Sequence, residues 1–113
     1  MDSEDGYFRT LTSLLKKIKR VKLDQVVNVV ERFSNSEVKA VEDLAFNILK
    51  GNIPLEGPLK EKAAANKDLY KQLTSKKSTI GQRRQILQDN PKFTRSLANI
   101  GLEALDDTQE QAS

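Results

Sequence analysis

The feature that most limits the possible folds of this chain is the spacing of its apolar residues, which recur every three or four positions. That spacing places them on one face of a helix. The first such stripe contains Tyr7, Phe8, Leu11, Leu14, Leu15 and Ile18. The chain has no tryptophan and only 5% aromatic residues, so Leu, Ile, Val and Ala supply most of its apolar surface. Both observations predict an all-α fold.

Short polar motifs mark where several helices begin and end. Ser34 and Glu37 form a capping box, in which the side chain of each residue binds the backbone amide of the other, and Thr79 and Gln82 repeat the pattern. Gly51 stands where a helix ends in a left-handed residue. Together with the apolar stripes, these signals predict a small bundle of about five to six short helices.

Residues 52–58 contain two prolines and a glycine and form the clear connector of the chain. The connector separates an N-terminal helical half, residues 1–51, from a basic helical half, residues 59–105. Residues 106–113 are polar and acidic, which predicts a disordered C-terminal tail. At 113 residues, these segments are expected to form one domain.

The basic half is expected to hold three helices. The first begins with Pro58 in its first turn and continues to Leu73. The second follows the capping box at Thr79 and carries Arg83 and Arg84 on its exposed side. The last helix follows a stop at Asn90-Pro91 and is amphipathic.

The composition excludes most catalytic chemistry. The chain has neither cysteine nor histidine, so it lacks thiolate nucleophiles, the commonest general base and the commonest zinc ligands. Adjacent acidic residues such as Glu42 and Asp43 point apart on a helix and cannot act as a carboxylate pair. No glycine-rich loop opens a helix with Lys and Ser or Thr. We therefore expect no enzymatic activity, no cofactor and no metal site.

The N-terminus predicts the compartment. Residues 1–5 are acidic and lack the basic and apolar regions of a signal peptide. No apolar run approaches the roughly 20 residues that span a bilayer. The expectation is an intracellular protein, neither secreted nor membrane-spanning, unless it is packaged in a particle.

Five positive charges lie within seven residues in the first basic cluster, which consists of Lys16, Lys17, Lys19, Arg20 and Lys22. Lysines and arginines in such a cluster can contact phosphates and release their counterions, which favours binding to nucleic acid or another polyanion. The alternatives are a solvated face or a nuclear-localisation-like segment. Cations are also favoured at a helix C-terminus by the macrodipole, so part of the cluster has a structural explanation.

The second basic cluster lies within residues 59–95, which hold ten basic and three acidic side chains, a net charge of +7. Its expected phosphate contacts are Lys60, Lys67, Lys71, Lys76, Lys77, Arg83 and Arg84. The arginine pair is the best suited, because guanidinium groups bind phosphate bidentately. No helix carries a base-reading set of Arg, Asn and Gln, so sequence-specific contacts are not expected. Tyr70 either stacks on a base or belongs to the core, and a plain solvated surface remains the alternative for the lysines.

Two stretches carry a family resemblance. Residues 45–55 read as an alanine–leucine helix ending in Lys-Gly-Asn, followed by Ile-Pro-Leu, and residues 69–88 contain a lysine-rich helix, a Ser-Lys-Lys turn and a second basic helix. In this order they resemble a small basic protein encoded beside capsid genes in Polinton or Maverick elements and their adintovirus relatives. The resemblance covers about residues 40–88. It implies a virion-associated or genome-associated role, comparable to the minor core proteins of adenoviruses.

The chain departs from that family after Gln88. Family members continue into a Gly-Gly apolar segment, whereas this chain continues through Asp89-Asn90-Pro91 into an amphipathic helix and an acidic tail. Their lysines are also denser than those between Lys60 and Lys77. Both differences argue against a purely DNA-condensing role and against a membrane-active tail.

Two functions follow as hypotheses. The first is a nucleic-acid-binding or packaging protein of a viral or mobile element, located in the host nucleus or the virion, that contacts phosphates without sequence preference. The alternative is a helical assembly or adaptor protein that oligomerises or docks on an acidic capsid or host partner through residues 23–58. That segment is net acidic and rich in apolar residues. A homo-oligomer is also plausible, because a small core gains from burying apolar faces between copies.

Overall fold

The part of the chain that the structure describes forms seven α-helices and one 3-10 turn, with no strand. The structure is a computed structural model, which describes the backbone of residues 2–112 and the side chains of residues 9–105. Its elements are α1 (Asp2–Arg20), η1 (Leu23–Gln25), α2 (Val26–Glu31), α3 (Asn35–Leu49), α4 (Pro58–Ala65), α5 (Lys67–Leu73), α6 (Ile80–Asp89) and α7 (Pro91–Ala112). The all-α prediction is confirmed, although the helices outnumber the five to six expected.

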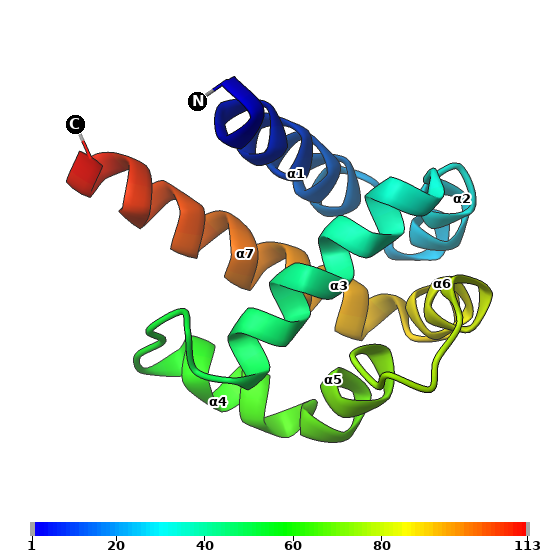
Figure 1. The fold of residues 1–113 in the computed structure, drawn as a ribbon. Coiled ribbons are helices and arrows are strands. Elements are labelled where there is room, and N and C mark those ends of the chain that lie inside the picture. Colours follow the sequence, from blue (N-terminus) through cyan, green and yellow to red (C-terminus); the bar gives the residue numbers. More distant parts are fainter. Residues whose placement is uncertain (1, 113) are drawn as a thin grey trace.

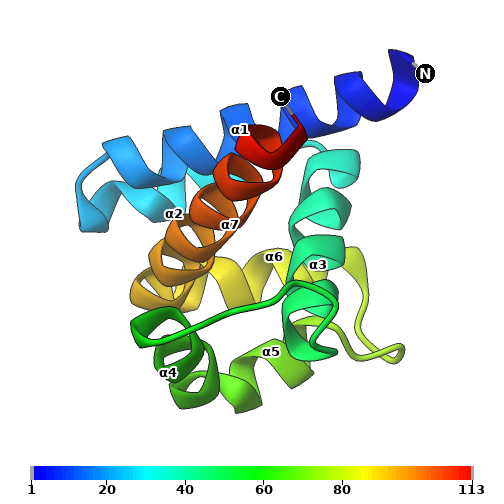
Figure 2. The same ribbon diagram turned by 90° about the vertical axis from the view of Figure 1, so that its left-hand side faces the viewer.

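Helices from the two sides of the connector interleave around one core. Helix α1 packs on α7, α2 packs on α6, and α3 lies between α1 and α5 (Figures 1 and 2). The largest fully buried side chains are Tyr70, Leu14, Leu15, Ile18, Leu73, Leu87, Leu97, Ile100, Val26, Val30, Val38 and Val41. Burying each such aliphatic side chain stabilises the fold by about 1.5–3 kcal/mol. Leu11, Leu14, Leu15 and Ile18 of the first predicted stripe therefore belong to the core, whereas the side chains of Tyr7 and Phe8 lie outside the described residues.

Both predicted capping boxes are present. At the start of α3, the amide of Glu37 donates to Ser34 Oγ at 3.1 Å, and the Ser34 amide donates to Glu37 Oε1 at 2.7 Å. At the start of α6, the Gln82 amide donates to Thr79 Oγ1 at 3.1 Å, and the Thr79 amide donates to Gln82 Oε1 at 2.8 Å. These bonds satisfy amides that have no partner within the helix. They fix where α3 and α6 begin.

Glycine ends α3 as predicted. Gly51 has a φ of +76°, and its amide and that of Asn52 return to the carbonyls of Ile48 and Asn47 at 3.2 and 2.9 Å. This hydrogen-bond pattern is a Schellman motif, which turns the chain out of the helix. Gly57 also has a positive φ, +58°, directly before α4. The connector is thus bounded by two left-handed glycines.

The prediction of one helix from Pro58 to Leu73 is wrong, because the segment breaks at Asn66 into α4 and α5. The Asn66 side chain donates to the carbonyl of Lys62 at 3.1 Å, and its amide donates to the carbonyl of Ala63 at 3.2 Å. Asparagine side chains compete in this way for backbone groups and favour a turn over a continuing helix. The apolar stripe alone does not reveal such competition.

Helix α7 begins after the predicted stop at Asn90 and continues to Ala112, beyond the end near Leu105 that the stripe indicates. The side chains of residues 106–113 lie outside the described residues. The prediction of a disordered acidic tail therefore stays a prediction.

Three helices meet closely at Gly101 of α7. A Cβ atom at this position would lie 2.6 Å from Leu44 Cδ2 and 2.8 Å from Leu15 Cδ1, both closer than real contacts allow. Leu44 belongs to α3 and Leu15 to α1, and both are buried. Gly101 thus permits α1, α3 and α7 to approach each other, a role that the sequence pattern did not indicate.

Candidate functional site

The lysines of both basic clusters are exposed, together with Arg20. In the first cluster these residues are Lys16, Lys17, Lys19, Arg20 and Lys22, and in the second they are Lys60, Lys62, Lys67, Lys71, Lys76, Lys77 and Lys92. Among the described side chains, the single ion pair joins Arg83 and Glu42. The exposed lysines therefore have no carboxylate partner within the described part of the chain.

Most residues of the two clusters lie on different sides of the molecule. Helix α1 carries Lys16, Lys17, Lys19 and Arg20 along one side, while α4, α5 and the loop after α5 lie on the opposite side (Figures 1 and 2). We name the six lysines of that opposite side, which are Lys60, Lys62, Lys67, Lys71, Lys76 and Lys77, the α4–α5 end. The body of the fold lies between this end and most of helix α1, while Lys92 of the second cluster lines one hollow with Leu23, the neighbour of Lys22.

The expectation that Arg83 and Arg84 are exposed is wrong, because both side chains are half-buried. Arg84 Nη1 donates to the carbonyls of Val30 and Phe33 at 2.8 and 2.6 Å, and Nη2 donates to Asn35 Oδ1 at 3.3 Å. These acceptors lie at the end of α2 and the start of α3. Arg84 thereby joins α6 to the turn between α2 and α3. The two carbonyls belong to residues 54 and 51 positions earlier in the sequence.

Arg83 has a similar structural role at the end of α5. Its Nε donates to the Leu73 carbonyl at 3.2 Å, and its Nη2 donates to the Ser75 carbonyl at 3.0 Å. Its Nη1 lies 3.4 Å from Glu42 Oε1, and both side chains are only 13% exposed. Arg83 therefore holds the loop that presents Lys76 and Lys77 rather than presenting its own charge to solvent.

A third arginine repeats the arrangement. Arg95 of α7 donates from Nη2 to the carbonyls of Ile18, at 3.4 Å, and Val21, at the end of α1. The last carbonyls of a helix have no partner within the helix, and cationic side chains satisfy them well. Arginines of the second cluster thus cap the C-terminal ends of α1, α2 and α5, which removes these arginines from the expected phosphate-binding set.

The same contacts change the interpretation of the first cluster. Lys17, Lys19 and Arg20 lie in the last turn of α1, where the macrodipole favours cations, but the carbonyls of Ile18 and Val21 accept hydrogen bonds from Arg95. No hydrogen bond or ion pair within the described residues involves the side chains of Lys17 or Arg20. These two cations instead border a groove between α1 and α2.

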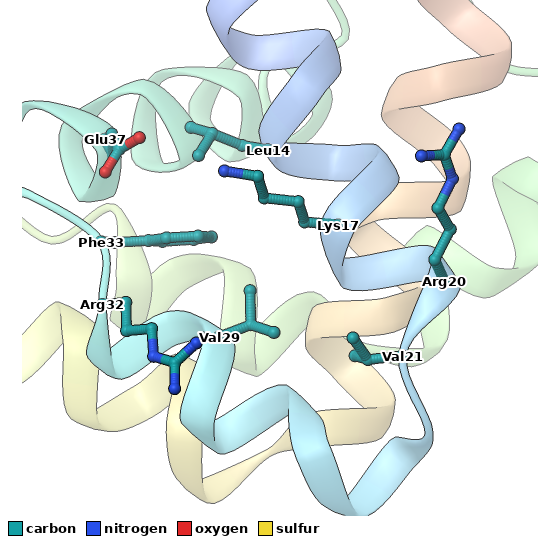
Figure 3. A pocket seen from close by; sticks show the side chains of 8 residues that line it. All are labelled: Leu14, Lys17, Arg20, Val21, Val29, Arg32, Phe33 and Glu37. Atoms are coloured by element: carbon teal, nitrogen blue, oxygen red, sulfur yellow. The ribbon is translucent and has the colours of Figure 1, made fainter.

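That groove, which we name the α1–α2 groove, has a volume of about 320 Å³. Its lining residues are Leu14, Lys17, Arg20, Val21, Val29, Arg32, Phe33 and Glu37. Four of them are apolar, three are cationic and one is acidic. Lys17 extends between Leu14 and Phe33 toward Glu37, while the guanidinium groups of Arg20 and Arg32 lie at the edges (Figure 3).

Arg32 is a candidate binding residue that the sequence analysis did not single out. It is exposed and lies at the C-cap of α2, and its side chain has no hydrogen bond or ion pair within the described residues. In the sequence it stands ten residues after the first cluster, within a net acidic segment. Only the packing of α2 against α1 brings it beside Lys17 and Arg20, so no sequence pattern could have joined them.

Tyr70 belongs to the core rather than to a base-stacking surface. Its side chain is 1% exposed, and its ring meets that of Phe93 edge-on, with centroids 5.0 Å apart and an interplanar angle of 87°. Its hydroxyl is buried without a hydrogen-bond partner. Burial raises the pKa of the Tyr70 phenol well above its ordinary value. Neither base stacking nor proton transfer with solvent is open to this side chain.

Comparison with protein-family models, curated proteins and solved structures finds no match to this chain. Among the described side chains, no group of three or more acidic residues gathers where it could hold a metal ion. None of the described helices is both long and apolar enough to cross a bilayer.

Proposed function

We propose that this chain binds nucleic acid without sequence preference through the α4–α5 end. The observation that supports the proposal best is that all six lysines of this end are exposed and unpaired, on three consecutive elements. Only two acidic residues, Glu61 and Asp68, lie among them in the sequence. A local excess of fixed cations attracts phosphates and displaces their counterions.

Polar groups beside these lysines suit the same function. An open hollow of about 580 Å³ adjoins Lys77, and its lining residues are Gln72, Ser75, Lys77, Ser78, Gln82, Gln85, Ile86, Asp89 and Asn90. Amide and hydroxyl donors of this kind contact phosphate and sugar oxygens and position a protein on nucleic acid without reading bases. The loop is held in place by Arg83, so Lys76 and Lys77 are presented on a fixed backbone.

The family resemblance of residues 40–88 supports a genome-associated role of this kind, in a virion or in the nucleus of a host. Lysines contribute point charges and no bidentate contacts. With Arg83 and Arg84 half-buried and bonded to backbone carbonyls, the surface that remains suits moderate, salt-sensitive binding rather than condensation.

Titration of a labelled DNA duplex at several salt concentrations tests the proposal. If the α4–α5 end makes about four phosphate contacts, affinity falls roughly 100-fold between about 50 and 200 mM salt. The double variant Lys67→Glu/Lys71→Glu should weaken binding and reduce the slope of log affinity against log salt by about two units, because each contact contributes about 0.9.

The double variant Lys16→Glu/Lys19→Glu makes the same change in net charge on the opposite side of the molecule. We expect it to reduce the slope by far less than the Lys67 and Lys71 variant does. Equal loss from the two doubles would show that net charge alone governs binding, and salt-independent or absent binding would refute the phosphate contacts.

A second candidate function, docking on a protein partner as an adaptor, is favoured by the α1–α2 groove. Phosphate binding needs cations but no apolar surface beside them. This groove has both cationic and apolar lining residues, which suits a protein partner better. Residues 23–58 were expected to provide the docking surface, and four of the eight lining residues, Val29, Arg32, Phe33 and Glu37, belong to that segment.

A further inference from the structure

We propose that the α1–α2 groove binds an acidic amphipathic peptide segment of a partner protein. The inference rests on the adaptor function and is independent of nucleic-acid binding at the α4–α5 end. It assigns a use to three cations, Lys17, Arg20 and Arg32, that no contact within the described part of the chain explains.

The three cations are available because other residues cap the adjacent helix ends. Arg95 donates to carbonyls at the end of α1, and Arg84 donates to carbonyls at the end of α2. Lys17, Arg20 and Arg32 are exposed and have no hydrogen bond or ion pair within the described residues. Arg20 and Arg32 therefore have no carboxylate partner among the described residues, and Lys17, which extends toward Glu37, forms no ion pair with it (Figure 3).

The apolar lining determines which anion fits. Leu14 and Phe33 are buried at the base, while Val21 and Val29 are partly exposed at the groove wall. An occupant with apolar side chains gains free energy by covering these valines, because it removes apolar surface from water. A polar sugar–phosphate backbone gains less from the same contact. The occupant should carry apolar side chains on one face and carboxylates beside them, as an acidic amphipathic helix does.

The size and polarity of the groove also favour a peptide. Its volume of about 320 Å³ is at the lower end of the range for sites that enclose a small molecule, so it suits a few anchoring side chains. Glu37 provides the one negative wall, and its Oε1 is held by the Ser34 amide in the capping box. A carboxylate of the partner is therefore repelled near Glu37 and attracted near Arg20 and Arg32, which sets the orientation of the bound segment.

The probe is a labelled synthetic peptide of about 16 residues in which Leu and Phe recur at helical spacing and Glu fills the other positions. We expect it to bind the intact chain. The variant Lys17→Glu/Arg32→Glu should lower its affinity about tenfold or more, because it replaces two attractions by two repulsions. Val29→Asp should lower affinity as well, by placing an uncompensated carboxylate on the apolar wall.

Matched controls separate the groove from net charge and from misfolding. Lys67→Glu/Lys71→Glu makes the same charge change at the α4–α5 end and should leave peptide affinity unchanged while it weakens DNA binding. Circular dichroism and denaturant unfolding of each variant confirm that the fold is retained. Amide chemical-shift changes on adding the peptide should centre on Val21 and Val29.

Three outcomes would overturn the inference. The first is equal affinity for a peptide whose Leu and Phe are replaced by Ser, since charge alone would then suffice. The second is peptide binding that is absent or is insensitive to Lys17→Glu/Arg32→Glu. The third is direct binding of duplex DNA that Lys17→Glu/Arg32→Glu weakens more than Lys67→Glu/Lys71→Glu does, which would make the groove a phosphate site. The salt-dependence experiment tests DNA binding at the α4–α5 end separately, so its result does not depend on any of these three outcomes.

Discussion

Arg84 and Arg32 both lie near the C-terminal end of α2, but only Arg84 donates hydrogen bonds to its carbonyls. Replacing Arg84 by Ala leaves the carbonyls of Val30 and Phe33 without this partner in a half-buried site. We expect a loss of about 2–4 kcal/mol in the free energy of unfolding, since each buried group left unpaired costs about 1–3 kcal/mol. Arg84→Lys should recover only part of it, because lysine lacks the planar fork.

Arg32→Ala is the matched control for that measurement by denaturant unfolding. This exposed side chain has no hydrogen bond within the described residues, so its loss should change stability by less than about 0.5 kcal/mol. If Arg84→Ala instead leaves stability unchanged and weakens DNA binding, the structural role of Arg84 is wrong.

Tyr70 makes stability sensitive to alkaline pH. Its pKa in the folded state lies above the ordinary value of 10.0, because burial disfavours the phenolate. The unfolded chain therefore loses this proton first. Stability is unaffected by the group below about pH 10, and the free energy of unfolding falls as pH rises from there toward the pKa of the folded state.

Tyr70→Phe should abolish the part of this alkaline loss that Tyr70 causes, while stability near pH 7 stays the same or increases, since the hydroxyl has no partner. Chemical denaturation of both proteins at about pH 8 and 11 makes the comparison. Lysine deprotonation affects both proteins alike, so only the difference between them reports on Tyr70. Parallel pH profiles would contradict this account.

At the scale of elements, two helical glycines should respond oppositely to replacement by alanine. Gly101 lies where α1 and α3 approach α7, so Gly101→Ala forces Leu15 and Leu44 to move. Overpacking costs about 1–3 kcal/mol and outweighs the gain of up to about 1 kcal/mol in helix propensity. We expect a net destabilisation of about 1–2 kcal/mol in thermal or denaturant unfolding.

Gly81 is the control for that experiment. Near a Cβ atom placed there, the closest atom is Thr79 Oγ1 at 3.9 Å, which is ordinary contact. Gly81→Ala should therefore stabilise α6 by about 0.5–1 kcal/mol, since alanine loses less entropy on folding. Equal effects of the two substitutions would show that close packing at Gly101 does not limit the fold.

At the scale of the whole molecule, the halves on either side of the connector depend on each other. Gly101 packs on Leu15 and Leu44 across the connector, and Arg84 and Arg95 donate to carbonyls of the first half. We expect separate fragments 1–51 and 58–113 to be largely unfolded alone and to gain helix when mixed. Circular dichroism of each fragment and of the mixture measures this gain.

The intact chain provides the reference. We expect it to unfold in a single cooperative transition, with the same midpoint by circular dichroism and by calorimetry. Native-like helix and protection from hydrogen exchange in either fragment alone would show that the halves are separate domains.

Much of the fold is encoded locally and could be predicted from the sequence. Helical periodicity identifies most buried positions, and the capping boxes at Ser34 and Thr79 and the stop at Gly51 depend on contacts within five residues. Asn66 shows the limit of this approach, because its side chain competes with a helix that the apolar stripe favours. Local signals therefore determined the fold class and most helix ends.

The tertiary structure alone decided which cations are free to bind. Arg83 and Arg84 have the same sequence signature as an exposed phosphate-binding pair, yet their partners are backbone carbonyls at other helix ends, up to 54 residues away. The α1–α2 groove likewise joins Lys17 to Arg32 only because α2 packs beside α1. A cationic side chain caps a helix only where packing brings backbone carbonyls within hydrogen-bond distance of it; elsewhere its charge stays available to a partner. Local sequence does not determine which carbonyls come that close.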